Sequence, residues 1–412
     1  MNQIKTKRLA PVVASVAIQL CLGTAYIWSV FQSGIAAHLF SEDQPSAALT
    51  FSLLLAILSL SSSAGGKLQD IIGPRLTVIA GGIILGAGFF LASYSTPDYP
   101  WLLWVSYGVM GGLGMGLIYS TTIACAQKWY PDKRGFITGI IVAALGFGGV
   151  MFTPLVEFLI KKLGDLSIPG SGELASFKVL GIIFIVVCTL GGLFIKNPPS
   201  GFAPAGWAAK QNGKEQLEDY LPSQVLRTPY FYYITIALML SCMSGLMIIG
   251  FAKPIAIAKG MEATATVGVF AITLFNSFGR LFWGGMSDKL GRKRTIIILL
   301  SATAIFSLCI NLVEGVFVYV LIALIGFAYG GFLCTYPAFT ADLFGTKYNA
   351  TNYGMVLLGF GSGAVAASYI AGYYKNVAKD DINLMFPAFA IAAAAAVVAI
   401  VFILMIKPKK VQ

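Results

Sequence analysis

Charged side chains are scarce in this sequence: Asp, Glu, Lys and Arg make up only 11% of its 412 residues. A soluble globular protein carries about 25% charged residues, so the composition argues against a water-soluble domain. Hydrophobic residues reach 57%. Many of them form runs of about 20 residues, the length that an α-helix needs to cross a bilayer. The composition therefore predicts an all-α integral membrane protein whose surroundings are lipid.

Histidine and cysteine are also rare, with one His and six Cys in the whole chain. The cysteines all fall in apolar segments, and none has the CxxC spacing of a metal or redox site. We interpret them as small apolar packing residues and expect no metal and no cofactor. An enzyme within the membrane would need clusters of His, Asp or Cys in its spans. The sequence has no such cluster, so we predict that the chain is not an enzyme.

The net charge of +11 is the feature that would suit a nucleic-acid partner. The basic residues are scattered among the loops, however, so we expect no nucleic acid and relate the charge to membrane topology. If the N-terminus is cytoplasmic, then 20 of the 28 Lys and Arg residues fall inside, one lies within a span, and seven fall outside. The outer residues are Lys161, Lys162, Lys178, Lys253, Lys259, Lys375 and Lys379. This bias fits the positive-inside rule and predicts a multi-pass protein of the cell membrane with both termini in the cytoplasm.

Apolar runs predict twelve transmembrane helices in two pseudo-symmetric six-helix bundles. We place them at residues 9–37, 46–67, 76–95, 100–127, 134–160, 176–195, 229–256, 263–287, 295–312, 315–341, 347–374 and 382–406. The one long polar interruption is rich in Pro, Gly and charge, which is typical of a linker. We therefore predict an N-terminal bundle at 1–195, a cytoplasmic linker at 196–228 and a C-terminal bundle at 229–412.

The loops after the second and eighth spans repeat one pattern, an Asp followed three residues later by Gly and then by basic residues. The two copies run Asp70-Ile-Ile-Gly73-Pro-Arg75 and Asp288-Lys-Leu-Gly291-Arg292. Gly permits a tight reversal, and the carboxylate can pair with basic groups or cap a neighbouring helix N-terminus. A solvated turn with ordinary cytoplasmic charges is the alternative. We interpret four residues as a conformational latch: Asp70, Arg75, Asp288 and Arg292.

Three further segments carry a family resemblance: Trp129–Gly135, Leu274–Arg280 and Asp342–Gly354, which begin Trp-Tyr-Pro-Asp, Leu-Phe-Asn-Ser and Asp-Leu-Phe-Gly. With the twelve spans and the paired loops, the chain resembles the major facilitator superfamily over essentially its whole length. More narrowly, it is similar to the oxalate:formate antiporter and monocarboxylate porter branch. The resemblance implies transport of short carboxylates by alternating access, in which two bundles rock around a site between them.

Arg280 is the basic residue that falls inside a predicted span. It lies about seven residues from the inner end of that span, roughly 10 Å deep at about 1.5 Å per residue. A charge at such depth costs at least about 2.5–3.5 kcal/mol. The 17 acidic residues fall in loops or near helix ends, so we expect the substrate anion to be the counter-ion of Arg280. The alternative is that its side chain reaches the cytoplasmic headgroups or binds C-terminal carbonyls of a helix.

Asn276 lies one helical turn before Arg280 on the same face, so an amide accompanies the guanidinium fork that can bind a carboxylate through two hydrogen bonds. The resemblance implies that the Arg of this span binds the carboxylate. Tyr119 is predicted at similar depth, where its hydroxyl can donate to the same carboxylate unless the ring simply packs. Further candidate wall residues, each also explained by packing, are Tyr26, Trp28, Tyr329, Tyr336, Leu145 and Phe360.

Two positions depart from the pattern that the resemblance implies. Oxalate-type members carry a second cation, a Lys, where this sequence has Phe360. Animal-type monocarboxylate porters carry an Asp where it has Asn276, and a Lys in the first span, which here has none after its cytoplasmic flank. One cation balances one carboxylate, so we predict a monocarboxylate such as lactate, pyruvate, acetate or formate, and not oxalate.

The driving ion is left open by the sequence. His38, near the outer end of the first span, is a residue type that exchanges protons near neutral pH, but we favour an interfacial role for it. A proton carried on the complex of Arg280 with its substrate is one alternative, and anion exchange without a proton group is another. The resemblance favours proton symport. A transporter-like sensor would carry a larger cytoplasmic segment than this sequence has, so we favour a transporter. We also expect the protein to be a monomer.

Overall fold

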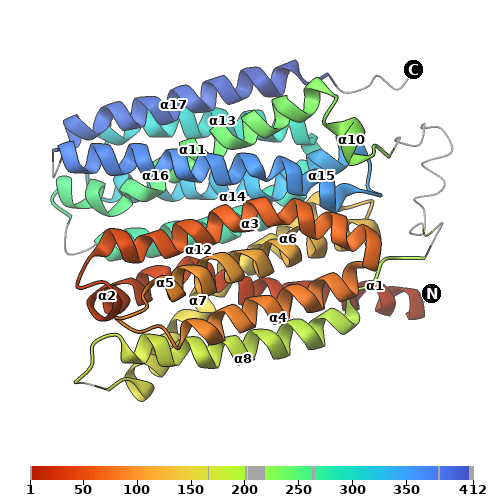
Figure 1. Ribbon diagram of the computed structural model, residues 1–412. Coiled ribbons are helices and arrows are strands. Elements are labelled where there is room, and N and C mark those ends of the chain that lie inside the picture. Colours follow the sequence, from red (N-terminus) through yellow and green to blue (C-terminus); the bar gives the residue numbers. More distant parts are fainter. Residues whose placement is uncertain are drawn as a thin grey trace. The chain divides into compact units, whose positions relative to one another are not determined.

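The computed structural model describes residues 2–165, 167–199, 202, 219–261, 265–378 and 381–407. Within these residues every regular element is a helix, which confirms the predicted all-α class (Figure 1). Eleven helical segments of this part are long and apolar enough to cross a membrane. Helix α12 (Ala265–Leu290), 26 residues long, is not one of the eleven and occupies the place of the predicted eighth span. Most of the predicted linker, residues 203–218, lies outside the described residues.

The chain divides into two compact units that exchange short segments of sequence. Unit 1 contains Met1–Trp129, Ala144–Phe202 and Tyr348–Met355, and unit 2 contains Tyr130–Ala143, Ala203–Lys347 and Val356–Gln412. Each unit therefore takes most of its residues from one half of the sequence and one short segment from the other half.

Unit 1 holds the helices of the N-terminal half. They are α1 (Asn2–Leu22), η1 (Gly23–Ile27), α2 (Trp28–Leu39), α3 (Gln44–Ile72), α4 (Pro74–Ala92), α5 (Trp101–Leu103), η2 (Trp104–Met110), α6 (Gly111–Trp129), most of α7 (Arg134–Leu163) and α8 (Ser171–Phe194), together with α15 (Asn349–Val356) except its last residue. Helices α4 and α8 run side by side (Figure 1). The short η1 is a 3₁₀ helix and η2 is a π-helix, so the first and fourth spans are less regular than predicted.

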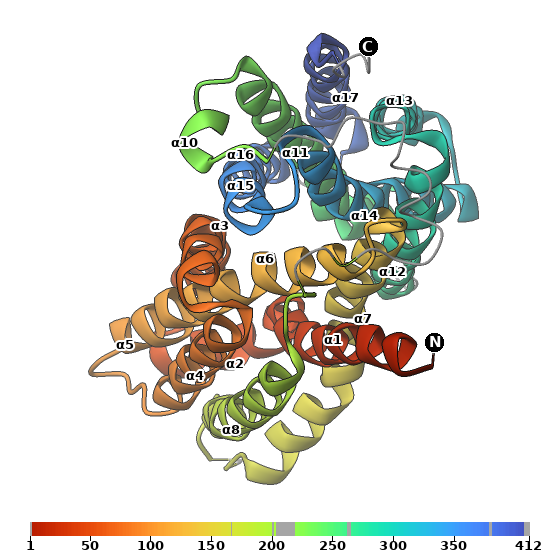
Figure 2. The ribbon, with the colours of Figure 1, turned by 90° about the vertical axis from the view of Figure 1, so that its right-hand side faces the viewer.

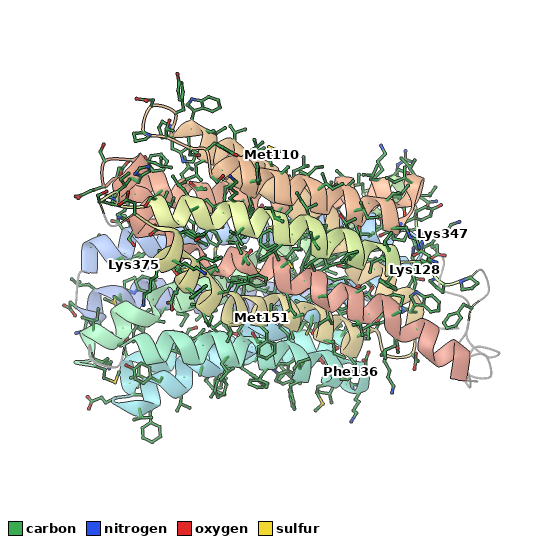
Figure 3. All side chains as sticks on the ribbon, turned by 90° about the horizontal axis from the view of Figure 1, so that it is seen from below. Met110, Lys128, Phe136, Met151, Lys347 and Lys375 are labelled. Atoms are coloured by element: carbon green, nitrogen blue, oxygen red, sulfur yellow. The ribbon has the colours of Figure 1, made fainter. Side chains whose placement is uncertain are left out.

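Unit 2 holds the helices of the C-terminal half. They are α10 (Pro222–Val225), α11 (Pro229–Ala258), α12, α13 (Arg292–Cys309), η4 (Ile310–Leu312), α14 (Val316–Phe344), α16 (Leu358–Ala378) and α17 (Ile382–Met405), joined by the first ten residues of α7. Helices α12 and α14 lie side by side (Figure 2). Lys347 and Lys375 lie at opposite ends of this unit (Figure 3).

Apolar side chains cover the outside of the helices as well as the cores. On α8, Ile182, Val186 and Leu190 are exposed at a spacing of four residues, which places them on one helix face. An exposed apolar stripe of this kind is suited to contact with lipid. Water-soluble proteins rarely expose large apolar patches. The surface therefore agrees with the membrane class that the composition predicts.

Two predicted boundaries are wrong in ways that matter for the sites. The apolar run predicts that the sixth span begins at residue 176, but α8 begins at Ser171, so Glu173 lies in its first turn. The predicted end of the eighth span is residue 287, but α12 continues to Leu290. The apolar runs define neither the start of α8 nor the end of α12, because each helix includes polar residues in its terminal turn.

Candidate functional site

Arg280 lies well inside α12, and its side chain is only 1% exposed. Two glycines of neighbouring helices fix the backbone at this point. A Cβ at Gly139 of α7 would lie 2.5 Å from the carbonyl oxygen of Arg280, and one at Gly330 of α14 would lie 3.1 Å from its backbone nitrogen. Larger residues would push these helices apart, so the glycines hold Arg280 between α7 and α14 within unit 2.

The guanidinium of Arg280 donates a hydrogen bond from Nη1 to the carbonyl oxygen of Val142 in α7, at 2.7 Å. Val142 lies well before the C-terminal end of α7 at Leu163, so the acceptor is a helix carbonyl, but not one of the helix C-terminal carbonyls given as the alternative from the sequence. A guanidinium carries five N–H donors. A carboxylate oxygen is a stronger acceptor than a carbonyl, because it carries negative charge and both partners of its bond to a guanidinium are then ionised.

Asn276 lies one turn before Arg280 and is buried, at 8% exposed. A Cβ at Gly330 would meet the backbone of both residues, so α14 approaches α12 most closely along this turn. Tyr329 precedes Gly330 and is also buried. Its ring lies against α11, since a Cβ at Gly245 would come within 2.6 Å of the ring. Arg280 and Asn276 thus lie on one turn of α12, and Tyr329 lies on α14, which packs against that turn.

Two other predicted site residues of unit 2 are buried in different surroundings. The hydroxyl of Tyr336 shares a hydrogen bond with Ser241 Oγ of α11 at 2.8 Å. Its hydroxyl therefore has a partner in the protein, as the packing alternative expects. Phe360 is buried in α16. The position where the resemblance implies a second cation is therefore an apolar side chain inside the unit.

Unit 1 contains the remaining predicted site residues. Trp28 begins α2 and is buried, with its ring 4.9 Å from the ring of Tyr107. Its indole Nε1 has no hydrogen-bond partner among the described residues. Tyr26 of η1 is 39% exposed. A buried indole donor is costly without an acceptor, so Trp28 stands out from an ordinary packing residue.

Tyr119 and Leu145 are buried in the same unit. The ring of Tyr119 lies 6.5 Å from the ring of Tyr353, measured between centroids. The backbone of Leu145 lies close to η1, because a Cβ at Gly23 would collide with its carbonyl oxygen. This approach of α7 to Gly23 occurs where the first span changes from α-helix to 3₁₀ helix.

The latch residues of unit 2 form a charged network. The carboxylate of Asp288 accepts hydrogen bonds from the backbone N–H groups of Gly135 and Phe136, at 3.0 and 2.8 Å, in the first turn of α7. Arg292 pairs with Asp288 and, at 3.2 Å, with Asp342. Arg134 also pairs with Asp342, at 3.0 Å. Sequence reasoning missed Arg134 and Asp342 as latch residues, although both lie in the motifs that carry the family resemblance.

The latch residues of unit 1 make fewer contacts. Asp70 accepts a hydrogen bond from Thr351 Oγ1 of α15 at 3.0 Å. Arg75 donates to the carbonyl oxygen of Leu193, at the end of α8, at 2.7 Å. Gly73 follows Asp70 with a φ of 84°, a backbone conformation that favours glycine. Thr351, like Arg134, is a partner that sequence reasoning did not find.

Known proteins resemble the chain over nearly its whole length. The sequence profile of the Major Facilitator Superfamily matches residues 13–368 and 263–412. The uncharacterized MFS-type transporter YhjX of Escherichia coli K12 is 32% identical over 370 residues, which cover 88% of this chain and 87% of that protein. The oxalate:formate antiporter of Oxalobacter formigenes is 28% identical over 353 residues, 83% of this chain and 79% of that one.

A solved structure agrees with these sequence matches at the level of the fold. The crystal structure of the transporter FucP in the outward conformation has a TM-score of 0.71 to this chain. It covers 97% of this chain and 99% of its own, at 13% sequence identity. At so low an identity the likeness concerns the fold alone.

Proposed function

We propose that this chain, which belongs to the major facilitator superfamily, is a secondary active transporter of small monocarboxylates such as lactate, pyruvate, acetate or formate. In this proposal it works by alternating access in the cell membrane, with both termini in the cytoplasm, as a monomer. Arg280 binds the carboxylate group of the substrate, and a proton moves with the anion in the same direction.

The observation that carries the proposal is the burial of Arg280 among helices of unit 2, with a hydrogen bond to a carbonyl oxygen 2.7 Å away. A buried guanidinium is costly unless oxygen acceptors surround it. A substrate carboxylate would supply such acceptors and would form two parallel, charge-assisted bonds. Asn276, one turn away, then offers an amide to a second polar group such as the hydroxyl of lactate or the keto oxygen of pyruvate.

Phe360 supports a substrate with one carboxylate. A second carboxylate would need a second cation, and the buried Phe360 offers an apolar surface there. Tyr329, beside Gly330, and Tyr336 are the further residues of unit 2 that we propose near the substrate. Tyr26, Trp28, Tyr119 and Leu145 of unit 1 stay predictions, and the unpartnered indole N–H makes Trp28 the most informative of them to test.

A second candidate is exchange of carboxylates, which is favoured by the similarity to the oxalate:formate antiporter. Counterflow in proteoliposomes separates the candidate substrates, since it needs only a substrate on both sides. We expect labelled lactate, pyruvate, acetate or formate to enter liposomes loaded with the same compound. Oxalate entry at an equal rate would overturn the assignment of a monocarboxylate substrate.

The role of Arg280 is tested by the substitution Arg280→Gln. Losing two charge-assisted hydrogen bonds, each contributing about 1.5 kcal/mol, should lower counterflow about 100-fold. Arg280→Lys keeps the charge but loses the fork, so it should retain partial activity. The matched control is Arg294→Gln, which removes an exposed guanidinium near the start of α13. Counterflow of Arg280→Gln at the wild-type rate would exclude Arg280 as the carboxylate binder.

A further inference from the structure

Glu173 is a half-buried carboxylate that lies against the backbone of another helix. It sits in the first turn of α8, and a methyl group added to Gly34 of α2 would collide with its carboxylate carbon and oxygens. The absence of a side chain at Gly34 therefore creates the space in which the carboxylate lies. The apolar run alone leaves Glu173 outside the span, and the observed start of α8 brings it into the helix.

His38 lies on the same face of α2, one turn after Gly34. The turn before α8 packs onto it: a Cβ at Gly170 would lie 2.6 Å from the Cβ of His38. Gly34 lies against the carboxylate of Glu173, and His38 follows Gly34 by one helical turn, so both side chains belong to the same side of α2. The only histidine of the chain and a half-buried carboxylate are thus neighbours within unit 1.

The two helix ends bear partial charges opposite in sign to the charges that the two groups can carry. His38 lies in the last turn of α2, and Glu173 lies in the first turn of α8. The C-terminal end of a helix carries partial negative charge, and the N-terminal end carries partial positive charge. These partial charges offset part of the cost of placing an imidazolium at the first end and a half-buried carboxylate at the second.

The other charged groups at this end of unit 1 have different surroundings. Ser167 donates two hydrogen bonds to Asp165, which lower the pKa of its carboxyl group and keep it ionised. Asp43 accepts from Ser46, and Lys178 lies over the ring of Phe90. The exposed remainder consists of Glu42, Asp98, Glu157, Lys161 and Lys162.

We propose that His38 and Glu173 form the proton-binding site of this transporter, an inference that rests on the proposed monocarboxylate symport. With a neutral imidazole the pair has a charge of −1. A proton from the medium binds the imidazole nitrogen and brings the net charge of the two groups to zero. In the proposed topology the site lies near the outer surface, where it takes up the proton that accompanies the anion on Arg280. Two side chains are too few to hold a structural zinc ion.

The test compares two uptake assays on reconstituted wild-type protein, Glu173→Gln and His38→Gln. The first assay is counterflow of labelled lactate at equal pH on both sides. The second is uptake driven by an outside pH about one unit lower, which supports about tenfold accumulation in one-to-one symport. We expect wild-type protein to reach this accumulation. Both variants should lose this acid-driven accumulation, so that the ratio of inside to outside lactate falls to about one. Their counterflow should still proceed above the background of empty liposomes.

Each outcome of this test decides something. Acid-driven accumulation by both folded variants at the wild-type level would overturn the proton site while leaving the transporter assignment intact. Accumulation by neither the variants nor the wild type, with counterflow present, would indicate exchange and would also overturn it. No wild-type counterflow with any monocarboxylate would refute the proposed function itself, and the proton site with it.

Two further variants make the test specific. Asp165→Asn removes an exposed carboxylate eight residues before Glu173 and should keep the full accumulation. Gly34→Ala displaces the carboxylate without removing it and should lower accumulation as Glu173→Gln does. Loss of accumulation in Asp165→Asn as well would point to a general effect of surface charge and would overturn the assignment to this pair.

Discussion

The loops after α3 and α12 have the same sequence pattern but make different contacts. Both turn through a glycine of nearly the same conformation, with φ of 84° at Gly73 and 87° at Gly291. In unit 2 the carboxylate of Asp288 accepts two backbone hydrogen bonds and forms an ion pair with Arg292. Arg292 also forms an ion pair with Asp342. In unit 1 Asp70 accepts a hydrogen bond from Thr351.

The repeated Asp-x-x-Gly motif therefore has the same turn conformation in both loops, but its aspartate makes contacts of different strength. Each aspartate meets the first turn of a helix from the other half of the sequence, α7 in unit 2 and α15 in unit 1. In unit 2 the carboxylate caps backbone N–H groups that a helix start leaves unsatisfied. In unit 1 a side-chain hydroxyl takes that place. We therefore expect the two loops to respond unequally to the same substitution.

Asp288→Asn should have the largest effect. The amide keeps one acceptor oxygen, but one backbone N–H loses its acceptor and the ion pair with Arg292 is lost. At about 1.5 kcal/mol or more for each charged hydrogen bond, the free energy of unfolding should fall by about 3 kcal/mol. The midpoint of thermal unfolding in detergent measures this. A midpoint equal to that of the wild type would show that the network contributes little to stability.

Gly73→Ala and Gly291→Ala should have intermediate and nearly equal effects, because the two turns share one backbone conformation. A non-glycine residue at these dihedral angles costs on the order of 1–3 kcal/mol. The same thermal measurement on both variants, with Gly372→Ala in α16 as a control that has open space, compares the turns directly. A large effect at one turn alone would contradict the shared conformation.

Asp70→Asn should have the smallest effect, below about 1 kcal/mol, because the amide oxygen still accepts from the Thr351 hydroxyl. Thr351→Val removes the donor and should cost about 1 kcal/mol. The double variant should cost little more than Thr351→Val alone, because the two residues share one bond. A loss in Asp70→Asn as large as in Asp288→Asn would mean that the two loops are equivalent after all.

The fold followed from the sequence to a large extent, because membrane spans are long apolar runs with a strong signal. The exceptions lie where polar residues belong to a helix. The apolar run begins after Glu173 and predicts a loop there, whereas α8 begins at Ser171. The 3₁₀ segment Gly23–Ile27 was not predicted, since it depends on the close approach of α7 to Gly23.

The position of Arg280 inside the protein could also be predicted, because a charge in the middle of an apolar run is carried into the membrane with its helix. Its acceptor, the carbonyl oxygen of Val142, could not be predicted. Every residue has a carbonyl group, and only the packing of α7 on α12 decides which one is within reach. The glycines at 139 and 330 were visible signals of close helix packing, but the sequence does not say which helices they join.

The exchange of segments between the sequence halves has a consequence for how the chain is made. The ribosome releases residues from the N-terminus onward, so folding of early parts usually precedes synthesis of later ones. Unit 1, however, includes Tyr348–Met355. It stays incomplete until most of unit 2 has been translated and inserted. The segment of the N-terminal half that belongs to unit 2, Tyr130–Ala143, has already been synthesised when the rest of unit 2 is translated. The unit that begins first is therefore completed late, and truncation before residue 348 would leave both units unfinished.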